Sequence, residues 1–443
     1  MAAGQLDDAA SVAGSDPEGN DPLAVFRHED LPRWALVHRA FDRAEVEDAA
    51  DAVRGALQPV LGLVAPGSRV CLAVGSRGID RIDEVVAATV VVLRARGAEV
   101  FVVPAMGSHG GATSEGQVEV LASLGVTRER IGCEIRSSME TALLGEVDGV
   151  PVFMDRIALT EADAIVPINR VKPHTDFDGP VESGLLKMIA IGLGKQRGAD
   201  TFHSRGFDSF DALIPRVAAF SLAHAPIPFG IALVENGYAR IVRIEAIEAP
   251  DMERRERELK LQADAFLARL PFASLDVLVI DRIGKDISGL GMDSNVVGRY
   301  YGGPTGRPPS IQRIFVRDLT DETEGNAVGI GMADVVHRRA VARMDRVKTY
   351  MNCVTAKTPE GARIAMTADT DRQGLDLALA CCLRVEPATA RIARIADTKH
   401  LEWFYASESL LAELRDRADC RIEGDLVPVA FDGDDNLRDQ LPT

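Results

Sequence analysis

Short apolar runs that alternate with amphipathic helical stretches are the feature that most constrains the fold of this chain. Residues 69–75, RVCLAVG, form an apolar run ending in glycine, residues 81–97 have helical length and a glycine stop, and residues 98–104, AEVFVVP, form the next run. This order is typical of a βαβ unit, in which a crossover helix joins two parallel strands. Further strand candidates, each followed by polar or glycine-rich sequence, cover 163–169 and 230–236. The pattern predicts an α/β protein with mostly parallel sheets.

The length of the chain predicts more than one domain. Its 443 residues exceed the usual size of a single hydrophobic core. Residues 251–270 form a charged amphipathic helix, after which the apolar run 275–281 restarts the alternation, so we expect the domains to meet there. The expected division is a disordered, acidic tail at 1–22, an N-terminal α/β domain at 23–271 and a C-terminal α/β domain at 272–443.

The charge and apolar content of the chain limit its partners and location. There are 67 acidic and 50 basic residues, which gives a formal net charge of −17. Nucleic acids and anionic membrane surfaces are therefore not expected as partners. No window approaches the roughly 18 uncharged apolar residues of a membrane-spanning helix, and the N-terminus lacks a secretory pattern, so we expect a cytoplasmic location. The six cysteines form no CxxC pair and are expected to be reduced thiols.

Loops that follow predicted strands carry candidate functional residues, because ligands of open α/β sheets bind at the carboxyl ends of strands. In GSRGID, Arg77 stands ahead of a helix, where a guanidinium suits a carboxylate or phosphate; a tight turn with a solvated arginine is the alternative. In MGSHGGATSEGQ, Ser114 and Gln117 are predicted to form a capping box, which leaves His109 in the preceding glycine loop. His109 is either a structural loop histidine or an imidazole presented to a ligand.

A third loop region, NRVKPHTDFDGPVESGLLKMIAIGLGKQRGADTFHS, contains two more histidines. His174 follows a predicted strand and a Lys-Pro turn. Lys187 lies within an apolar run, where a lysine is costly unless it is paired, neutralised or covalently used; a lysine that reaches solvent from a helix edge is the alternative. His203 follows Lys187 by 16 residues, beyond GLGKQRGAD, a weak phosphate-loop pattern that contains Lys195. Three histidines and one lysine on loops of one sheet favour a metal or an acid/base pair over core packing.

The ordered set GSHGGATSEGQ, KPH, GLLKM and a histidine 16 residues after the lysine resembles the nickel-dependent lactate racemase family. The resemblance covers roughly residues 25–240 and extends more loosely beyond them. It implies two α/β domains with an active-site cleft between them and a nickel-pincer nucleotide (pyridinium-3-thioamide-5-thiocarboxylic acid mononucleotide) as cofactor. It also implies that Lys187 carries this cofactor covalently and that His203 ligates the nickel. His109 and His174 match the family's acid/base pair.

The same resemblance implies further contacts to cofactor and substrate. By position, Arg77 matches an arginine that anchors the substrate. In the second domain, the loop 280–295, IDRIGKDISGLGMDSN, resembles a subgroup distinct from lactate racemase itself. Lys285, Asp293 and Asn295 there are candidate substrate contacts, although a surface lysine and local turn hydrogen bonds are the alternatives. We therefore expect a different or larger 2-hydroxy acid, such as a hydroxy-diacid or sugar acid. The predicted cofactor contacts are Lys187, His203, Arg77, Gly110 and Lys195.

The implied activity is that of an isomerase, a racemase or epimerase of a 2-hydroxy acid. Loss of hydride leaves a neutral ketone rather than a poorly stabilised carbanion, and two imidazoles, one for each enantiomer, move the hydroxyl proton. Nickel is well served by imidazole and soft sulfur ligands. The expected partners are the small-molecule substrate and cofactor-biosynthesis proteins.

Three other classes of protein compete with this interpretation. A non-catalytic binder of the pincer nucleotide would need the lysine and the metal ligand, but not two additional bases. A zinc hydrolase could use His109, His174 and His203 as ligands, although no HxH or HExxH spacing is present. A nucleotide-dependent dehydrogenase would suit the fold class, although no GxGxxG follows the first strand.

Overall fold

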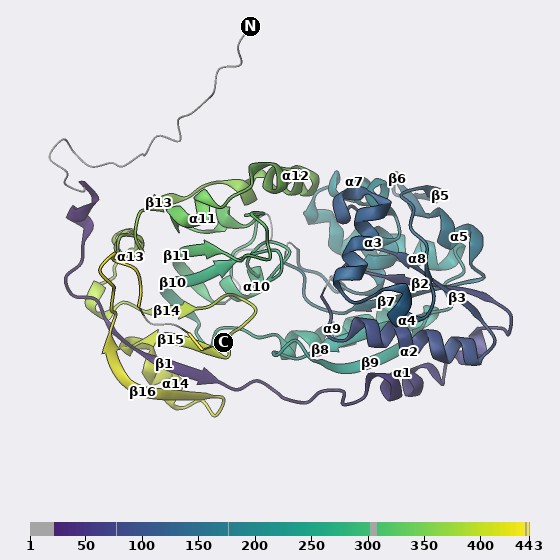
Figure 1. Ribbon diagram of the computed structural model, residues 1–443, viewed down its shortest axis with the longest axis horizontal. Helices are drawn as coiled ribbons and strands as arrows, with labels where there is room; N and C mark the ends of the chain where they lie inside the picture. The colour runs from purple at the N-terminus through teal and green to yellow at the C-terminus, as the bar shows by residue number, and fades with distance from the viewer. Residues whose placement is uncertain (1–21, 77, 176, 302–307, 439–440, 443) are drawn as a thin grey trace, which may run out of the picture.

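The protein consists of two α/β domains that lie side by side along its longest axis (Figure 1). The computed structural model describes residues 22–76, 78–175, 177–301, 308–438 and 441–442. The predicted tail therefore lies outside the described residues, apart from Pro22 at the start of the 3-10 helix η1 (Pro22–Phe26), and so does Arg77. None of the described helices is both long and apolar enough to cross a bilayer.

The first domain is built on a six-stranded sheet of order β4-β3-β2-β7-β8-β9. All neighbouring strands are parallel except β8 and β9. The chain begins in the middle with β2, proceeds outward through β3 and β4, and returns to the other side of β2 with β7, so the sheet is doubly wound with its switch point between β2 and β7. The strands are β2 (Arg69–Val74), β3 (Glu99–Pro104), β4 (Glu134–Ile135), β7 (Ala164–Arg170), β8 (Phe229–Glu235) and β9 (Ile241–Glu248).

Helices cover both faces of this sheet, which explains why its strands are continuous apolar runs. Along β2, Val70 and Leu72 pack into the core on one face, whereas Cys71 and Ala73 pack into the core on the other. The first face is covered by α1 (Ala49–Leu57) and α2 (Ile82–Ala95). The second face is covered by α6 (Leu185–Lys187), the π-helical turn η4 (Met188–Gly192), α7 (Lys195–His203), α8 (Phe210–His224), α9 (Met252–Phe266) and the hairpin of β5 (Thr141–Val147) and β6 (Val150–Asp155). The remaining helices of this domain are α3 (Ser114–Ser123), α4 (Arg128–Ile131) and α5 (Arg156–Glu161).

The second domain is built on an eight-stranded sheet of order β13-β12-β11-β10-β14-β15-β1-β16. The strands from β13 to β14 in this order are parallel, and the last three are antiparallel. Its switch point lies between β10 and β14. The strands are β1 (Arg33–Arg39), β10 (Ser274–Ile283), β11 (Ser310–Leu319), β12 (Val335–His337), β13 (Met366–Ala368), β14 (Ile392–Ile395), β15 (Trp403–Ser407) and β16 (Cys420–Pro428). The helices are α10 (Ser294–Val297), α11 (Arg338–Ala342), α12 (Arg346–Ala356), α13 (Asp371–Ala380) and α14 (Leu411–Arg415).

The position of β1 differs from the division predicted from the sequence. Residues 33–39 were expected in the N-terminal domain, but β1 pairs with β15 and β16 in the second sheet (Figure 1). Trp34, Ala35 and Val37 are buried in the cores of the second domain. The pairing partners of β1 lie more than 350 residues away in the sequence, so no local pattern identifies them. The chain therefore crosses between the domains twice, after β1 and after α9.

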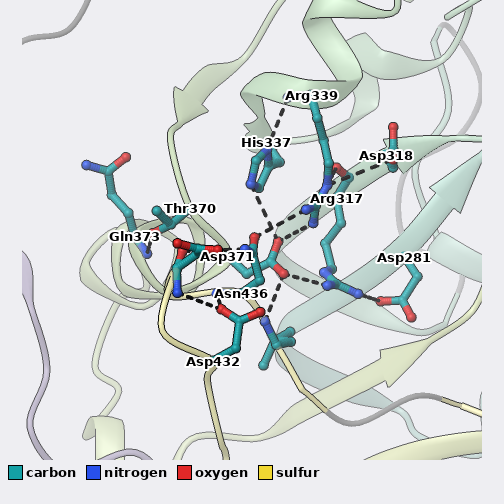
Figure 2. Close-up of polar contacts among 12 residues, drawn as sticks. Asp281, Arg317, Asp318, His337, Arg339, Thr370, Asp371, Gln373, Asp432 and Asn436 are labelled. Atoms are coloured by element: carbon teal, nitrogen blue, oxygen red, sulfur yellow. Dashed lines mark hydrogen bonds and ion pairs between the residues drawn. The ribbon is translucent and has the colours of Figure 1, made fainter.

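A network of charged side chains around buried Asp371 fastens the C-terminal segment to the second sheet (Figure 2). Asp371, at the start of α13, accepts hydrogen bonds from the guanidinium groups of Arg317 at 2.5 Å and Arg339 at 2.6 Å, and from the backbone nitrogen of Leu437 at 3.0 Å. Arg317 also donates to Asp281 at 2.7 Å. Burial alone would raise the pKa of Asp371, but the hydrogen bond and charge of Arg317 outweigh it and lower that pKa. The network thus stabilises the packing of residues 432–437 on the domain.

Candidate active site between the domains

The carboxyl edges of both sheets face one cavity of about 400 Å³. In the first domain, Gly75 follows β2 and Lys172 follows β7, and both line this cavity. In the second domain, Lys285 follows β10 and Thr398 follows β14, and both line it as well. These four loops flank the two switch points, where doubly wound sheets bind their ligands. The two domains therefore present their binding edges to the same space.

Six of the residues predicted from the sequence lie on this cavity, and three do not. The residues on the cavity wall are His109, His174, Lys187, His203, Lys285 and Asp293. Gly110, Lys195 and Asn295 are outside the wall, and Arg77 is outside the described residues.

His174 and Lys187 are direct neighbours in the cavity. The Nε2 atom of His174 and the amine of Lys187 form a hydrogen bond. Phe177 supports both groups, because its ring centroid lies 4.5 Å from that of His174 and 5.5 Å from the Lys187 nitrogen. An imidazole beside a half-buried amine can accept the proton that the amine must lose before it reacts as a nucleophile. The surroundings of Lys187 therefore suit covalent attachment.

Buried Glu182 holds the loop that carries His174. Its carboxylate accepts hydrogen bonds from the backbone nitrogen of His174 at 2.5 Å and of Gly179 at 3.1 Å, and it pairs with Lys260 at 2.7 Å. Burial raises the pKa of Glu182, although Lys260 opposes this effect. These contacts fix the backbone of the loop at His174 and at Gly179.

The second domain holds the same loop from across the cavity. Asn295 donates from its side chain to the carbonyl oxygen of His174 at 3.1 Å, and the Asp293 carboxylate pairs with Lys172 at 2.8 Å. The other Asp293 oxygen accepts from the backbone and side-chain nitrogens of Asn295 at 2.9 and 3.1 Å. Burial alone would raise the pKa of Asp293, but Lys172 and Asn295 outweigh burial and lower it. Both Asp293 oxygens are engaged by protein groups, so Asp293 bridges the two domains at the cavity wall, and its contact with a substrate stays a prediction.

His203, at the end of α7, has the properties of a metal ligand. Its Nδ1 atom is buried and has no hydrogen-bond partner among the described residues, and its ring stacks on Phe210 with centroids 5.8 Å apart. The pKa of His203 is lowered to about 4, mainly by burial and to a smaller extent by the nearby charge of Lys187. The imidazole is therefore neutral at pH 7, which is the form that binds a metal. A single buried nitrogen fits a cofactor that supplies the remaining ligands itself.

The three histidines do not form a common metal site. Within the described part of the chain, no three His, Cys, Asp or Glu side chains converge closely enough to hold a metal ion. This geometry does not support the zinc hydrolase considered from the sequence, which would require three protein ligands.

His109 lies in the glycine loop after β3, and its Nδ1 atom hydrogen-bonds with the hydroxyl of Ser76. Gly110 adopts a left-handed φ of 66°, and a Cβ there would lie 2.5 Å from the carbonyl carbon of Gly116. Gly110 thus permits the loop to pack on α3 instead of contacting the cofactor as predicted.

The predicted capping box is also wrong: Thr113 caps α3 by accepting from the Gly116 nitrogen at 3.0 Å. The predicted N-cap lies one residue too late, because Thr113, which directly precedes Ser114, also has a side-chain oxygen that can cap a helix.

Lys195 is fully buried away from the cavity, contrary to its predicted cofactor role. Its amine donates to the Pro104 carbonyl oxygen at 2.5 Å and to Gln117 Oε1 at 3.2 Å, and it pairs with Asp155 at 2.8 Å. The glycines around Lys195 in the sequence indicated a loop near a ligand, but they do not indicate the direction of the lysine side chain.

Five further charged residues on the cavity wall were missed, namely Arg170, Lys172, Glu235, Asp286 and Lys399. Arg170, at the end of β7, forms an ion pair with Glu235 at the end of β8. Their positions at the carboxyl ends of adjacent parallel strands were the available signal. On the opposite wall, Lys285 donates to the Gly289 carbonyl oxygen and to Asn352, each at 2.7 Å.

Comparison with solved structures finds a protein of similar fold. The lactate racemase apoprotein from Thermoanaerobacterium thermosaccharolyticum superposes with a TM-score of 0.51 at 14% sequence identity, over 80% of this chain and 92% of that chain. No protein-family model and no curated protein sequence matches the chain. The likeness confirms the predicted fold class of two α/β domains with mostly parallel sheets.

Proposed function

We propose that this protein is a racemase or epimerase of a 2-hydroxy acid that uses a nickel-pincer nucleotide. The main support is that His109, His174, Lys187 and His203 meet on one cavity at the facing switch points of two doubly wound sheets. The fold that the chain shares with a lactate racemase apoprotein agrees with this proposal. Loading would depend on cofactor-biosynthesis proteins in the cytoplasm of the host.

Lys187 and His203 are the residues that would hold the cofactor. The Lys187 amine is the attachment point, and the buried Nδ1 of His203 offers one neutral nitrogen ligand to nickel. When bound, the cofactor would accept hydride from the carbon that bears the hydroxyl and return it.

His109 and His174 would exchange the hydroxyl proton of the substrate. They come from loops after different strands, β3 and β7, and are held independently, the first by Ser76 and the second by Glu182. One imidazole would take the hydroxyl proton from one enantiomer, and the other imidazole would give a proton to the oxygen of the opposite enantiomer, with the two roles exchanged in the reverse direction. Two separately held bases are what inversion requires and what a storage protein does not need.

The cavity favours an anionic substrate with a second polar end. The basic side chains that line it, Arg170, Lys172, Lys187, Lys285 and Lys399, outnumber its carboxylates, Glu235, Asp286 and Asp293, although the chain carries a net charge of −17. Lys285 lies on the wall opposite the first domain with Ser288 and Asn352. These groups suit the second carboxylate of a hydroxy-diacid or the hydroxyls of a sugar acid.

The attachment is tested by intact-mass spectrometry and metal analysis of the full chain, expressed in cells that make the pincer nucleotide. We expect a mass increment with stoichiometric nickel, both lost in Lys187→Ala. Lys399→Ala, which removes an exposed lysine of the same cavity, serves as the control and should keep both. Absence of increment and nickel in a host that loads a known family member would refute the proposal.

The reaction is tested by chiral chromatography of a panel of 2-hydroxy acids with the loaded protein. Racemisation or epimerisation of a diacid or sugar acid is expected, and it should be lost in His109→Ala and His174→Ala. Activity on lactate alone would refute the larger substrate. A loaded protein that converts no acid would favour the non-catalytic binder.

A further inference from the structure

We propose that the buried amine of Lys195 positions His109 and His203 relative to each other, and that Gln117 transmits this effect to His109. The inference rests on the proposed function for the roles of the two histidines. The contacts on which it rests do not involve the proposed ligands, because Lys195, Gln117 and Asp155 are all fully buried and outside the cavity wall.

Lys195 joins three elements of the first domain. Its amine donates hydrogen bonds to Pro104 at the end of β3 and to Gln117 in α3, and it forms an ion pair with Asp155 at the end of β6. Two hydrogen bonds and one ion pair therefore hold the buried ammonium group. Lys195 also adopts a left-handed φ of 53°, an unfavourable conformation for a residue with a Cβ. Such a conformation persists where surrounding contacts fix it, and the two hydrogen bonds and the ion pair of the amine are contacts of that kind.

The ammonium group determines the orientation of the Gln117 side chain. Because an ammonium group can only donate hydrogen bonds, it requires the Oε1 atom of Gln117 to face it. The Nε2 atom is then directed to the glycine loop, where it donates to the carbonyl oxygens of Gly107 at 2.9 Å and His109 at 3.3 Å. Replacing the lysine with an apolar residue would remove the cause of this orientation.

The same lysine begins the helix that ends at His203. Helix α7 runs from Lys195 to His203, so the amine fixes its first residue to the end of β3. A second link joins the segment before this helix to the His109 loop, since the Gly107 nitrogen donates to the Gly192 carbonyl oxygen at 3.1 Å. A buried Lys–Asp pair contributes little net stability compared with a packed apolar pair, so its presence here is consistent with a role in specifying geometry.

The test uses the full-length apoprotein and needs neither cofactor nor substrate. Carbethoxylation by diethyl pyrocarbonate, mapped by peptide mass spectrometry, measures the reactivity of each histidine. Hydrogen exchange measures the exchange rates of the backbone amides of residues 105–110. Gln117→Met removes both bonds to the loop, together with the bond that Gln117 accepts from Lys195, at nearly constant volume. The double variant Lys195→Met, Asp155→Asn removes the whole junction without leaving a buried charge. Gln312→Met, which removes comparable amide bonds in the second domain, is the matched control.

In Gln117→Met we expect His109 reactivity and loop exchange to rise about five-fold or more, because two hydrogen bonds are lost. The rate of His174 should not change. In the double variant both His109 and His203 should react faster, and Gln312→Met should change neither. If Gln117→Met lowers the melting temperature but leaves His109 reactivity and loop exchange at wild-type values, the residue is merely structural and the inference is wrong. This result would hold even if the double variant did not fold, and it does not depend on loading at Lys187.

Discussion

Glu256 allows a direct test of how the segment that carries Lys187 is stabilised. It lies fully buried in α9 and accepts hydrogen bonds from the backbone nitrogens of Leu185 at 2.6 Å and Leu186 at 3.1 Å, at the start of α6. Its Oε1 atom is buried without a hydrogen-bond partner among the described residues. Burial raises the pKa of Glu256 to about 7, although the two backbone hydrogen bonds oppose this. A group of this kind makes stability depend on pH.

The direction in which stability changes with pH follows from the number of protons that the folded and unfolded states bind. With an ordinary pKa of 4.5 in the unfolded chain and about 7 in the folded protein, Glu256 binds more protons when folded across this interval. Its contribution is therefore fully present below pH 4.5 and is lost as the pH rises to about 7, at a cost of about 3 kcal/mol. Glu256→Gln is neutral at every pH and can still accept both hydrogen bonds. Its amide nitrogen lacks a partner at the Oε1 position, so we expect a net gain of about 1–2 kcal/mol at pH 8.

Urea unfolding at pH 5 and pH 8, followed by far-UV circular dichroism, measures both effects. Circular dichroism is preferred to fluorescence because Trp34 and Trp403 both lie in the second domain. Glu248→Gln, an exposed change just before α9, is the control and should keep the wild-type pH dependence. If Glu256→Gln lost as much stability between the two pH values as the wild type, the buried charge would not be the cause.

Three further substitutions test neighbouring parts of the site. Gly184→Ala places a methyl group against the Glu256 carboxyl and should lower the free energy of unfolding by about 2 kcal/mol, measured in the same urea assay. His203→Ala should reduce the nickel retained by loaded protein at least about ten-fold in equilibrium dialysis, while the circular dichroism spectrum is unchanged. Lys172→Met leaves the buried carboxylate of Asp293 without its cation, so it should cost about 3 kcal/mol at pH 7 and less at pH 4, where the carboxyl can be protonated. Equal destabilisation at both pH values would contradict that reasoning.

The parallel parts of both sheets could be predicted from the sequence because their strands are buried on both faces. Residues 69–75 and 98–104 correspond to β2 and β3 within a residue at each end. The gathering of His109 and His174 followed from the same pattern, since loops after parallel strands emerge at one edge. The pairing of β1 with β15 and β16 could not be predicted, because antiparallel partners so distant in sequence leave no local signal.

The two lysines show where local sequence stops being informative. Lys187 in GLLKM and Lys195 in GLGKQ have similar neighbours, yet the first lines the cavity and the second is buried beside Asp155. The difference depends on acceptors elsewhere in the chain, including Gln117, which lies 78 residues earlier. A sequence pattern identifies a lysine in apolar surroundings, but the fold decides which lysine meets buried acceptors.

A layer of buried polar residues beneath the cavity explains how glycine-rich loops can hold functional groups in fixed positions. Glu182 binds the backbone of His174, Gln117 binds that of His109, and Glu256 binds the turn that leads to Lys187. The first is 1% exposed and the other two are 0% exposed, and none of the three lines the cavity. Each acts on backbone atoms, so side chains on the cavity wall can vary with the substrate while their positions stay fixed. Substitutions in this layer should therefore change the geometry of the site without changing any residue that a ligand would touch.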